Sequence, residues 1–169
     1  TGKAGGLGTI LPDFRRLLGE RLFCGYSLQI ACTALSFMAF LGGAPYVTSR
    51  LLGRPPSDYG LFFIPVAFCY MVANFVAARI SPRVGIDRMI SMGVAITVTG
   101  ATAGAVLHLA GLLSPATVFG PMAVMAFGHG FCIPNGFAGS VSVDARLAGA
   151  AAGLTGFLQM AIGAAASPP

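Results

Sequence analysis

The chain has 169 residues, of which 56% are hydrophobic and 9% are charged, with a formal net charge of +5. Soluble domains carry about 25% charged residues, so this composition excludes a soluble globular protein. The excess of arginine is typical of the cytoplasmic loops of membrane proteins, and no basic face with interleaved aromatic residues predicts binding of nucleic acid.

The N-terminal segment, residues 1–20, is polar and contains several glycines, and it is predicted to be a cytoplasmic approach to the membrane. Phe14, Leu17 and Leu18 are expected to form an amphipathic turn that lies on the membrane surface. The N-terminal segment lacks the apolar middle region that a secretory signal requires. Because the chain starts without methionine and stops close to an apolar run, we expect a fragment of a longer membrane protein.

Five apolar stretches follow, each long enough to cross a hydrocarbon core of about 30 Å, which takes about 20 helical residues. The predicted spans within the bundle 21–169 are residues 22–45, 59–78, 89–109, 117–139 and 147–167. The fold class is therefore an all-α, polytopic transmembrane helix bundle.

A charged island at residues 78–89 separates the second and third spans and is predicted to be a loop at the membrane surface. Short loops rich in Lys and Arg stay in the cytoplasm. If the N-terminus is cytoplasmic, Arg50 and Arg54 are the only basic residues outside the cell. The basic residues on the cytoplasmic side are then Lys3, Arg15, Arg16, Arg21, Arg79, Arg83, Arg88 and Arg146.

Polar side chains inside the spans are the first candidates for function, because they are costly in hydrocarbon. In the first span such residues recur at steps of three, four and three, which places them on one helical face. This face is expected to line an aqueous cavity or to form interhelical hydrogen bonds. Its members are Tyr26, Gln29, Thr33 and Ser36. A similar stripe in the second span comprises Phe63, Ala67, Tyr70 and Asn74.

His129 is a titratable side chain inside the fourth span, five residues before the helix-loosening Pro134. It could relay protons, line a cavity or serve as a hydrogen-bonded packing residue. We hypothesise that one substrate cavity is lined by Tyr26, Gln29, Thr33, Tyr70, Asn74, His129, Asn135 and Gln159.

Small residues recur at helical spacing in the third and fifth spans and predict close packing of helices. These seams comprise Gly93, Thr97, Gly100 and Gly104, and then Gly149, Gly153 and Gly156. Four cysteines within apolar runs are interpreted as small buried residues: Cys24, Cys32, Cys69 and Cys132. No zinc-ligand spacing, phosphate-binding loop or nucleophile–base pair is present, so we expect no enzyme, metal or cofactor.

The island resembles the loop motif Gly-x-Leu-Ala-Asp-Arg-x-Gly-Arg-Lys of the major facilitator superfamily through Arg83, Gly85 and Arg88. It departs from that motif at three positions: Ala78 replaces the first glycine, Pro82 replaces the aspartate, and Asp87 stands where a basic residue is usual. Four other segments resemble Bcr/CflA-type drug-resistance transporters. They are residues 40–47 (FLGGAPYV), 57–62 (SDYGLF), 133–135 (IPN) and 148–160 (AGAAAGLTGFLQM).

This resemblance implies that the five spans are the seventh to eleventh helices of a twelve-helix transporter, and so most of half of a major facilitator fold. It implies proton-driven efflux of small drugs by alternating access, in the bacterial inner membrane, together with a missing N-terminal half that carries the proton-coupling residues. The cytoplasmic loop motif would then comprise Arg79, Arg83, Gly85 and Arg88, of which Arg83, Gly85 and Arg88 would belong to a conformational latch.

Two alternatives to this transporter remain. The first is a non-transporting membrane scaffold that assembles through the two glycine seams. The second is a half-size transporter that dimerises.

Overall fold

The computed structural model describes residues 7–165, and this part of the chain is helical with no strand. The sequence-based predictions for Lys3 and for residues 166–167 lie outside the described residues. The helices are α1 (Leu7–Gly19), α2 (Arg21–Tyr46), the π-helical turn η1 (Val47–Leu51), α3 (Pro56–Val84), α4 (Ile86–Leu109), α5 (Pro115–Ser142), the 3-10 turn η2 (Ala145–Leu147) and α6 (Ala148–Ala165).

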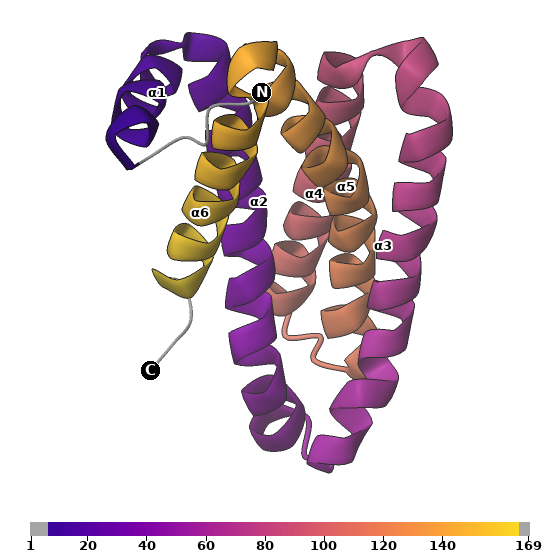
Figure 1. Ribbon diagram of the computed structural model, residues 1–169. Coiled ribbons are helices and arrows are strands. Elements are labelled where there is room, and N and C mark those ends of the chain that lie inside the picture. The colour runs from indigo at the N-terminus through magenta and orange to yellow at the C-terminus, as the bar shows by residue number, and fades with distance from the viewer. Residues whose placement is uncertain (1–6, 166–169) are drawn as a thin grey trace.

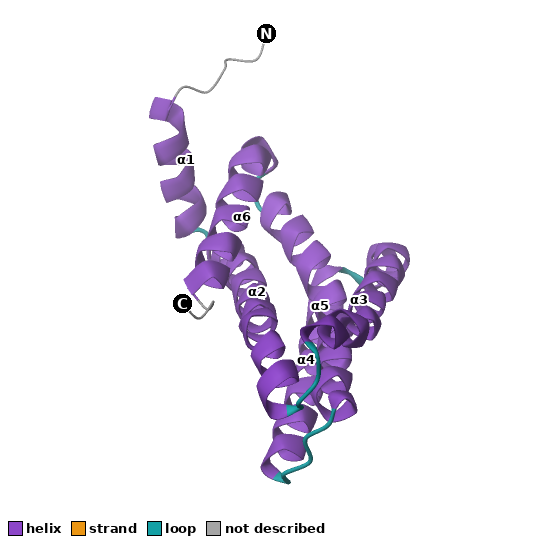
Figure 2. Ribbon diagram, turned by 90° about the horizontal axis from the view of Figure 1, so that it is seen from below, coloured by secondary structure: helices purple, strands orange, loops and turns teal. Residues whose placement is uncertain are grey.

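Five of these helices are long and apolar enough to cross a membrane, namely α2 with η1, α3, α4, α5, and α6 with η2. The predicted fold class, an all-α transmembrane bundle, is confirmed. Figure 1 shows these five helices running roughly side by side, whereas α1 lies beside one end of the bundle, next to α6. Figure 2 shows α1 from the side, projecting away from the other helices.

The charged island is helical rather than a loop. α3 continues to Val84 and α4 begins at Ile86, so Gly85 alone interrupts the helix. Gly85 has a φ of 91°, a conformation that residues with a Cβ atom rarely adopt. The prediction of a loop at 78–89 was wrong because the end of an apolar run marks where a helix can leave the membrane, and this need not be where the helix ends. Charged residues can continue the helix beyond the apolar run.

α5 is the central helix of the bundle and packs against α2, α3, α4 and α6. Glycines allow three of these close approaches. A Cβ atom added at Gly93 of α4 would lie 2.7 Å from the carbonyl oxygen of Gly128, and one added at Gly130 would lie 3.0 Å from that of Tyr70 in α3. One added at Gly139 would meet the ring of Tyr26 in α2 at 2.8 Å.

The predicted seam on the third span is therefore confirmed as a packing surface inside the bundle, where α4 meets α5. The seam on the fifth span behaves differently. Cβ atoms added at Gly149, Gly153 or Gly156 would meet nothing within 4 Å among the described residues.

α1 is held against the bundle by apolar contacts and one ion pair. Leu17 is fully buried with Phe23 of α2 and Ala151 of α6, and Phe14 packs on the same cluster. Leu18 is 53% exposed. Of the three residues expected on the membrane surface, two therefore contact protein, because α1 turns its apolar side toward α2 and α6.

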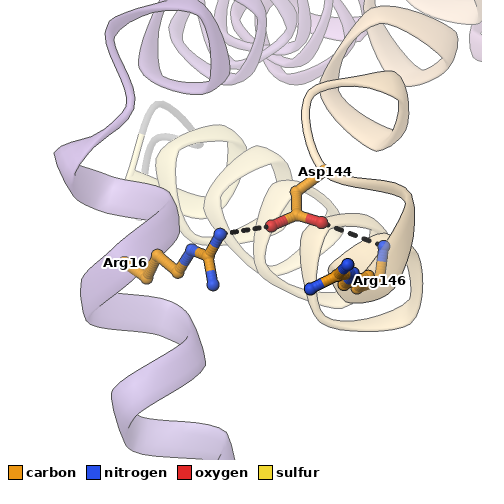
Figure 3. A network of polar contacts seen from close by, with 3 residues as sticks. All are labelled: Arg16, Asp144 and Arg146. Atoms are coloured by element: carbon orange, nitrogen blue, oxygen red, sulfur yellow. Dashed lines mark hydrogen bonds and ion pairs between the residues drawn. The ribbon is translucent and has the colours of Figure 1, made fainter.

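The ion pair joins a guanidinium nitrogen of Arg16 to Asp144, which precedes η2, at 3.0 Å. The other carboxylate oxygen of Asp144 accepts a hydrogen bond from the backbone N–H of Arg146 at 3.0 Å (Figure 3). One carboxylate thus fixes α1 to the α5–α6 connection.

The cysteines are free thiols in different environments. Cys132 is buried, Cys24 and Cys69 are partly buried, and Cys32 is exposed. The prediction of burial is wrong for Cys32, because its side chain lines an open hollow between α2 and α4 instead of packing into the bundle.

Candidate functional site

The predicted cavity residues do not share one cavity. Three of them, Tyr70, His129 and Gln159, line a recess of about 280 Å³ that is bounded by α2, α3, α5 and α6. We call it the four-helix recess. Its lining comprises Phe37, Met38, Phe63, Val66, Ala67, Tyr70, His129, Ile133 and Gln159. None of these side chains carries a formal charge when His129 is neutral, so the recess is apolar with isolated polar groups.

The polar stripe of the first span faces a different space, the α2–α4 groove, which we describe as three hollows. Two of them lie between α2 and α4, and the third is lined mainly by α4 and α5. Tyr26 and Gln29 line a hollow of about 370 Å³ near the start of α2. Gln29 and Thr33 line the next, of about 220 Å³, with Thr97 of α4 opposite. The third, of about 270 Å³, is mostly apolar and includes His108.

The two predicted asparagines line neither space, and each donates a hydrogen bond to a carbonyl within its own helix. The amide nitrogen of Asn74 donates to the carbonyl of Tyr70 at 2.8 Å. Asn135 is 4% exposed, and its amide nitrogen donates to the carbonyl of Phe131 at 2.8 Å. The side-chain oxygen of Asn135 accepts a hydrogen bond from Ser81 of α3. Asn135 thereby ties α5 to α3.

His129 lies between the recess and the groove. Its side chain is 1% exposed, and Nε2 lies 3.2 Å from the hydroxyl oxygen of Ser36, which lines the middle hollow of the groove. Phe37 meets the imidazole edge-on, with ring centroids 6.4 Å apart. Nδ1 of His129 has no hydrogen-bond partner among the described residues. The ring is therefore held in place through one nitrogen only.

Phe37 and Met38 were missed when the cavity was predicted from polar residues alone. Phe63, Ala67 and Tyr70 follow one another on one face of α3, and all three line the recess as their spacing suggested. No sequence pattern identified Phe37 as a lining residue, because the rotation of α2 relative to α5 determines which face of α2 contacts the recess.

The residues of the predicted latch lie at the end of the bundle that carries α1. The guanidinium of Arg79 lies over the ring of Phe75, 4.8 Å from its centroid, and Arg83 and Arg88 are exposed. Asp87, in the first turn of α4, accepts a hydrogen bond of 2.6 Å from the hydroxyl of Tyr26. This bond connects α2 with α4 across the end of the groove.

Sequence comparison finds distant relatives. The multidrug transporter MdfA of Edwardsiella piscicida is 26% identical over 118 residues, which cover 70% of this chain and 29% of that protein. The uncharacterized MFS-type transporter YdgK of Bacillus subtilis is 23% identical over 169 residues, with 96% and 40% covered. The chloramphenicol resistance protein CraA of Acinetobacter baumannii is 26% identical over 91 residues, with 54% and 22% covered.

These matches support membership of the major facilitator superfamily. The chain spans only 22% to 40% of the length of these relatives. No family model matches the chain, and no solved structure matches it.

Proposed function

We propose that this chain is part of a Bcr/CflA-type drug exporter of the major facilitator superfamily and supplies its seventh to eleventh helices. The four-helix recess carries the proposal. Its residues come from the middle of α2, α3 and α5 and from α6, and transporters bind their substrates near the middle of the membrane. Apolar and aromatic walls with a few polar groups are typical of small-molecule sites.

In this proposal the recess is one half of a drug site, and the complementary half of the transporter closes against it during alternating access. Transport is driven by protons, and the charged residues that carry them belong to the rest of the transporter, because no carboxylate lines the recess. The protein resides in the bacterial inner membrane, with the end that carries α1 in the cytoplasm.

The test is an efflux assay of the natural full-length protein in a bacterial strain whose own drug pumps have been deleted. We expect lower accumulation of chloramphenicol than in cells without the protein, and we expect a proton uncoupler to abolish the difference. Tyr70→Ala should weaken efflux at matched expression, whereas Thr97→Ala in the groove should have a smaller effect. Unchanged accumulation of chloramphenicol and of other drugs, with the protein present in the membrane, would contradict the proposal.

The alternative of a membrane scaffold loses one of its two assembly surfaces. The seam from Gly93 to Gly104 already packs against α5. The glycine face of α6 remains as the candidate contact surface of a scaffold. If the protein is a fully active pump, a scaffold role is not needed to explain its function.

A further inference from the structure

We propose that the outer side of α1 is a lipid-binding surface, on which Leu11 and Leu18 insert between the headgroups of the bilayer and Arg15 pairs with the phosphate of an anionic lipid. α1 then joins the protein to the membrane surface, with one side on the bundle and another on lipid. The inference concerns the exterior of the protein and is independent of what the four-helix recess binds.

The apolar stripe of α1 is wider than the protein surface that it contacts. Leu17 is fully buried against α2 and α6, and Phe14 packs on the same cluster. Leu11 and Leu18 are seven positions apart and therefore lie on one side of the helix. These two leucines are 75% and 53% exposed, so the described part of the chain leaves much of their apolar surface uncovered. Half of the stripe contacts protein, and the other half is available to lipid.

The connection to α2 places this uncovered side at the level of a membrane surface. α1 ends at Gly19, and only Glu20 separates it from α2, which is long and apolar enough to span a bilayer. Figure 2 shows α1 projecting away from the other helices. An amphipathic helix that is joined to the end of a span and extends beside the bundle lies among lipid headgroups, where insertion of exposed leucines is favourable.

The two arginines of α1 have different environments. The guanidinium of Arg16 is paired with Asp144 of the protein at 3.0 Å. Arg15 lies on the side of the two exposed leucines, is itself exposed, and forms no ion pair with any described residue. Glu20 and Arg21, which follow α1, cancel one another in charge. The outer side of α1 therefore carries one uncompensated positive charge beside apolar surface, a combination that favours an anionic membrane surface.

The first experiment tests whether this side of α1 contacts lipid. The natural full-length protein, with its native cysteines removed, is reconstituted in vesicles of phosphatidylcholine and phosphatidylglycerol. A polarity-sensitive fluorophore is attached at Leu11→Cys, and its quenching by lipids brominated in the upper part of the acyl chains is measured. Asp13→Cys is the matched control, because a helix of 3.6 residues per turn places position 13 on the opposite side of α1.

We expect strong quenching of the fluorophore at position 11 and little at position 13. Two results at position 11 would overturn the inference. Emission typical of water would show that this side of α1 stays in solution. Emission typical of an apolar environment that the brominated lipids do not quench would show that another part of the protein covers it.

The second experiment tests the role of Arg15 with the same fluorophore at position 11. Bromine is placed on phosphatidylglycerol alone or on phosphatidylcholine alone, and the ratio of the two quenching efficiencies reports which lipid is enriched beside α1. We expect phosphatidylglycerol to be enriched about fivefold, the usual effect of one cation near an anionic surface. Arg15→Gln should abolish most of this enrichment. Arg54→Gln removes the same charge at the opposite end of the bundle and should leave it unchanged. No enrichment in the parent protein, or an unchanged enrichment in Arg15→Gln, would overturn the pairing of Arg15 with anionic lipid.

Discussion

Tyr26 makes two contacts at once at the end of the bundle that carries α1. Its ring covers Gly139 of α5, and its hydroxyl donates to Asp87 at the start of α4. One side chain therefore connects three helices. The sequence showed Tyr26 as the first member of a polar stripe, but its partner sixty-one positions later could not be inferred from that spacing.

Tyr26→Phe should destabilise the protein by about 1 kcal/mol, because the ring remains against Gly139 while the hydrogen bond to a carboxylate is lost at a partly exposed site. The measurement is the thermal unfolding midpoint of the full-length protein in detergent. Tyr70→Phe is the matched control, since Tyr70 is 36% exposed in the recess. An equal decrease in both variants would show that the bond between Tyr26 and Asp87 contributes nothing to stability.

At the scale of the helix, apolar length predicted which segments cross the membrane but not where the helices end. α3 continues beyond its apolar stretch through Arg79 and Arg83 and ends at Gly85. The polar stripe of α2 was correctly placed on one face, but which neighbour that face meets depends on how α2 is rotated against α5. Leu17 is a similar case, because its apolar character fits a membrane surface and a protein surface equally well.

The two glycine seams provide a direct comparison between packed and open helix faces. Gly93→Val should destabilise the bundle by about 3 kcal/mol, near the upper end for overpacking, because the added atoms meet the backbone of Gly128. Gly153→Val should have little effect, since nothing lies within 4 Å of that position among the described residues. Folded yield and thermal midpoint, measured on the full-length protein, would test this difference.

A large loss for Gly153→Val would contradict that expectation. It would show that another helix covers this face of α6 in the membrane, as the scaffold alternative requires. A negligible effect for Gly93→Val would mean that α4 and α5 can separate by the width of a side chain without cost.

For the whole molecule, the arrangement places basic residues at both ends of the bundle in unequal number. Arg79, Arg83 and Arg88 share one end with α1, whereas Arg50 and Arg54 lie at the opposite end, between α2 and α3. This asymmetry follows the rule that cytoplasmic segments carry the excess of Lys and Arg. It predicts the orientation of the protein in the membrane.

Single cysteines introduced at positions 54 and 88, after removal of the four native cysteines, would test this orientation. In intact cells a thiol reagent that cannot cross the membrane should label Arg54→Cys and leave Arg88→Cys unlabelled. Permeabilised cells serve as the control and should show labelling of both. The opposite pattern in intact cells would place the α1 end outside the cell.

The glycines of α5 restrict how this protein can change over evolutionary time. Gly128 faces α4, Gly130 faces α3, and Gly139 faces α2, so a larger residue on any of three sides meets a neighbour. The outward sides of α3 and α4 carry exposed apolar residues such as Phe68 and Val106. Many different side chains would be tolerated at these positions. A saturation mutagenesis screen should therefore find α5 the least tolerant helix and the helices around it more tolerant.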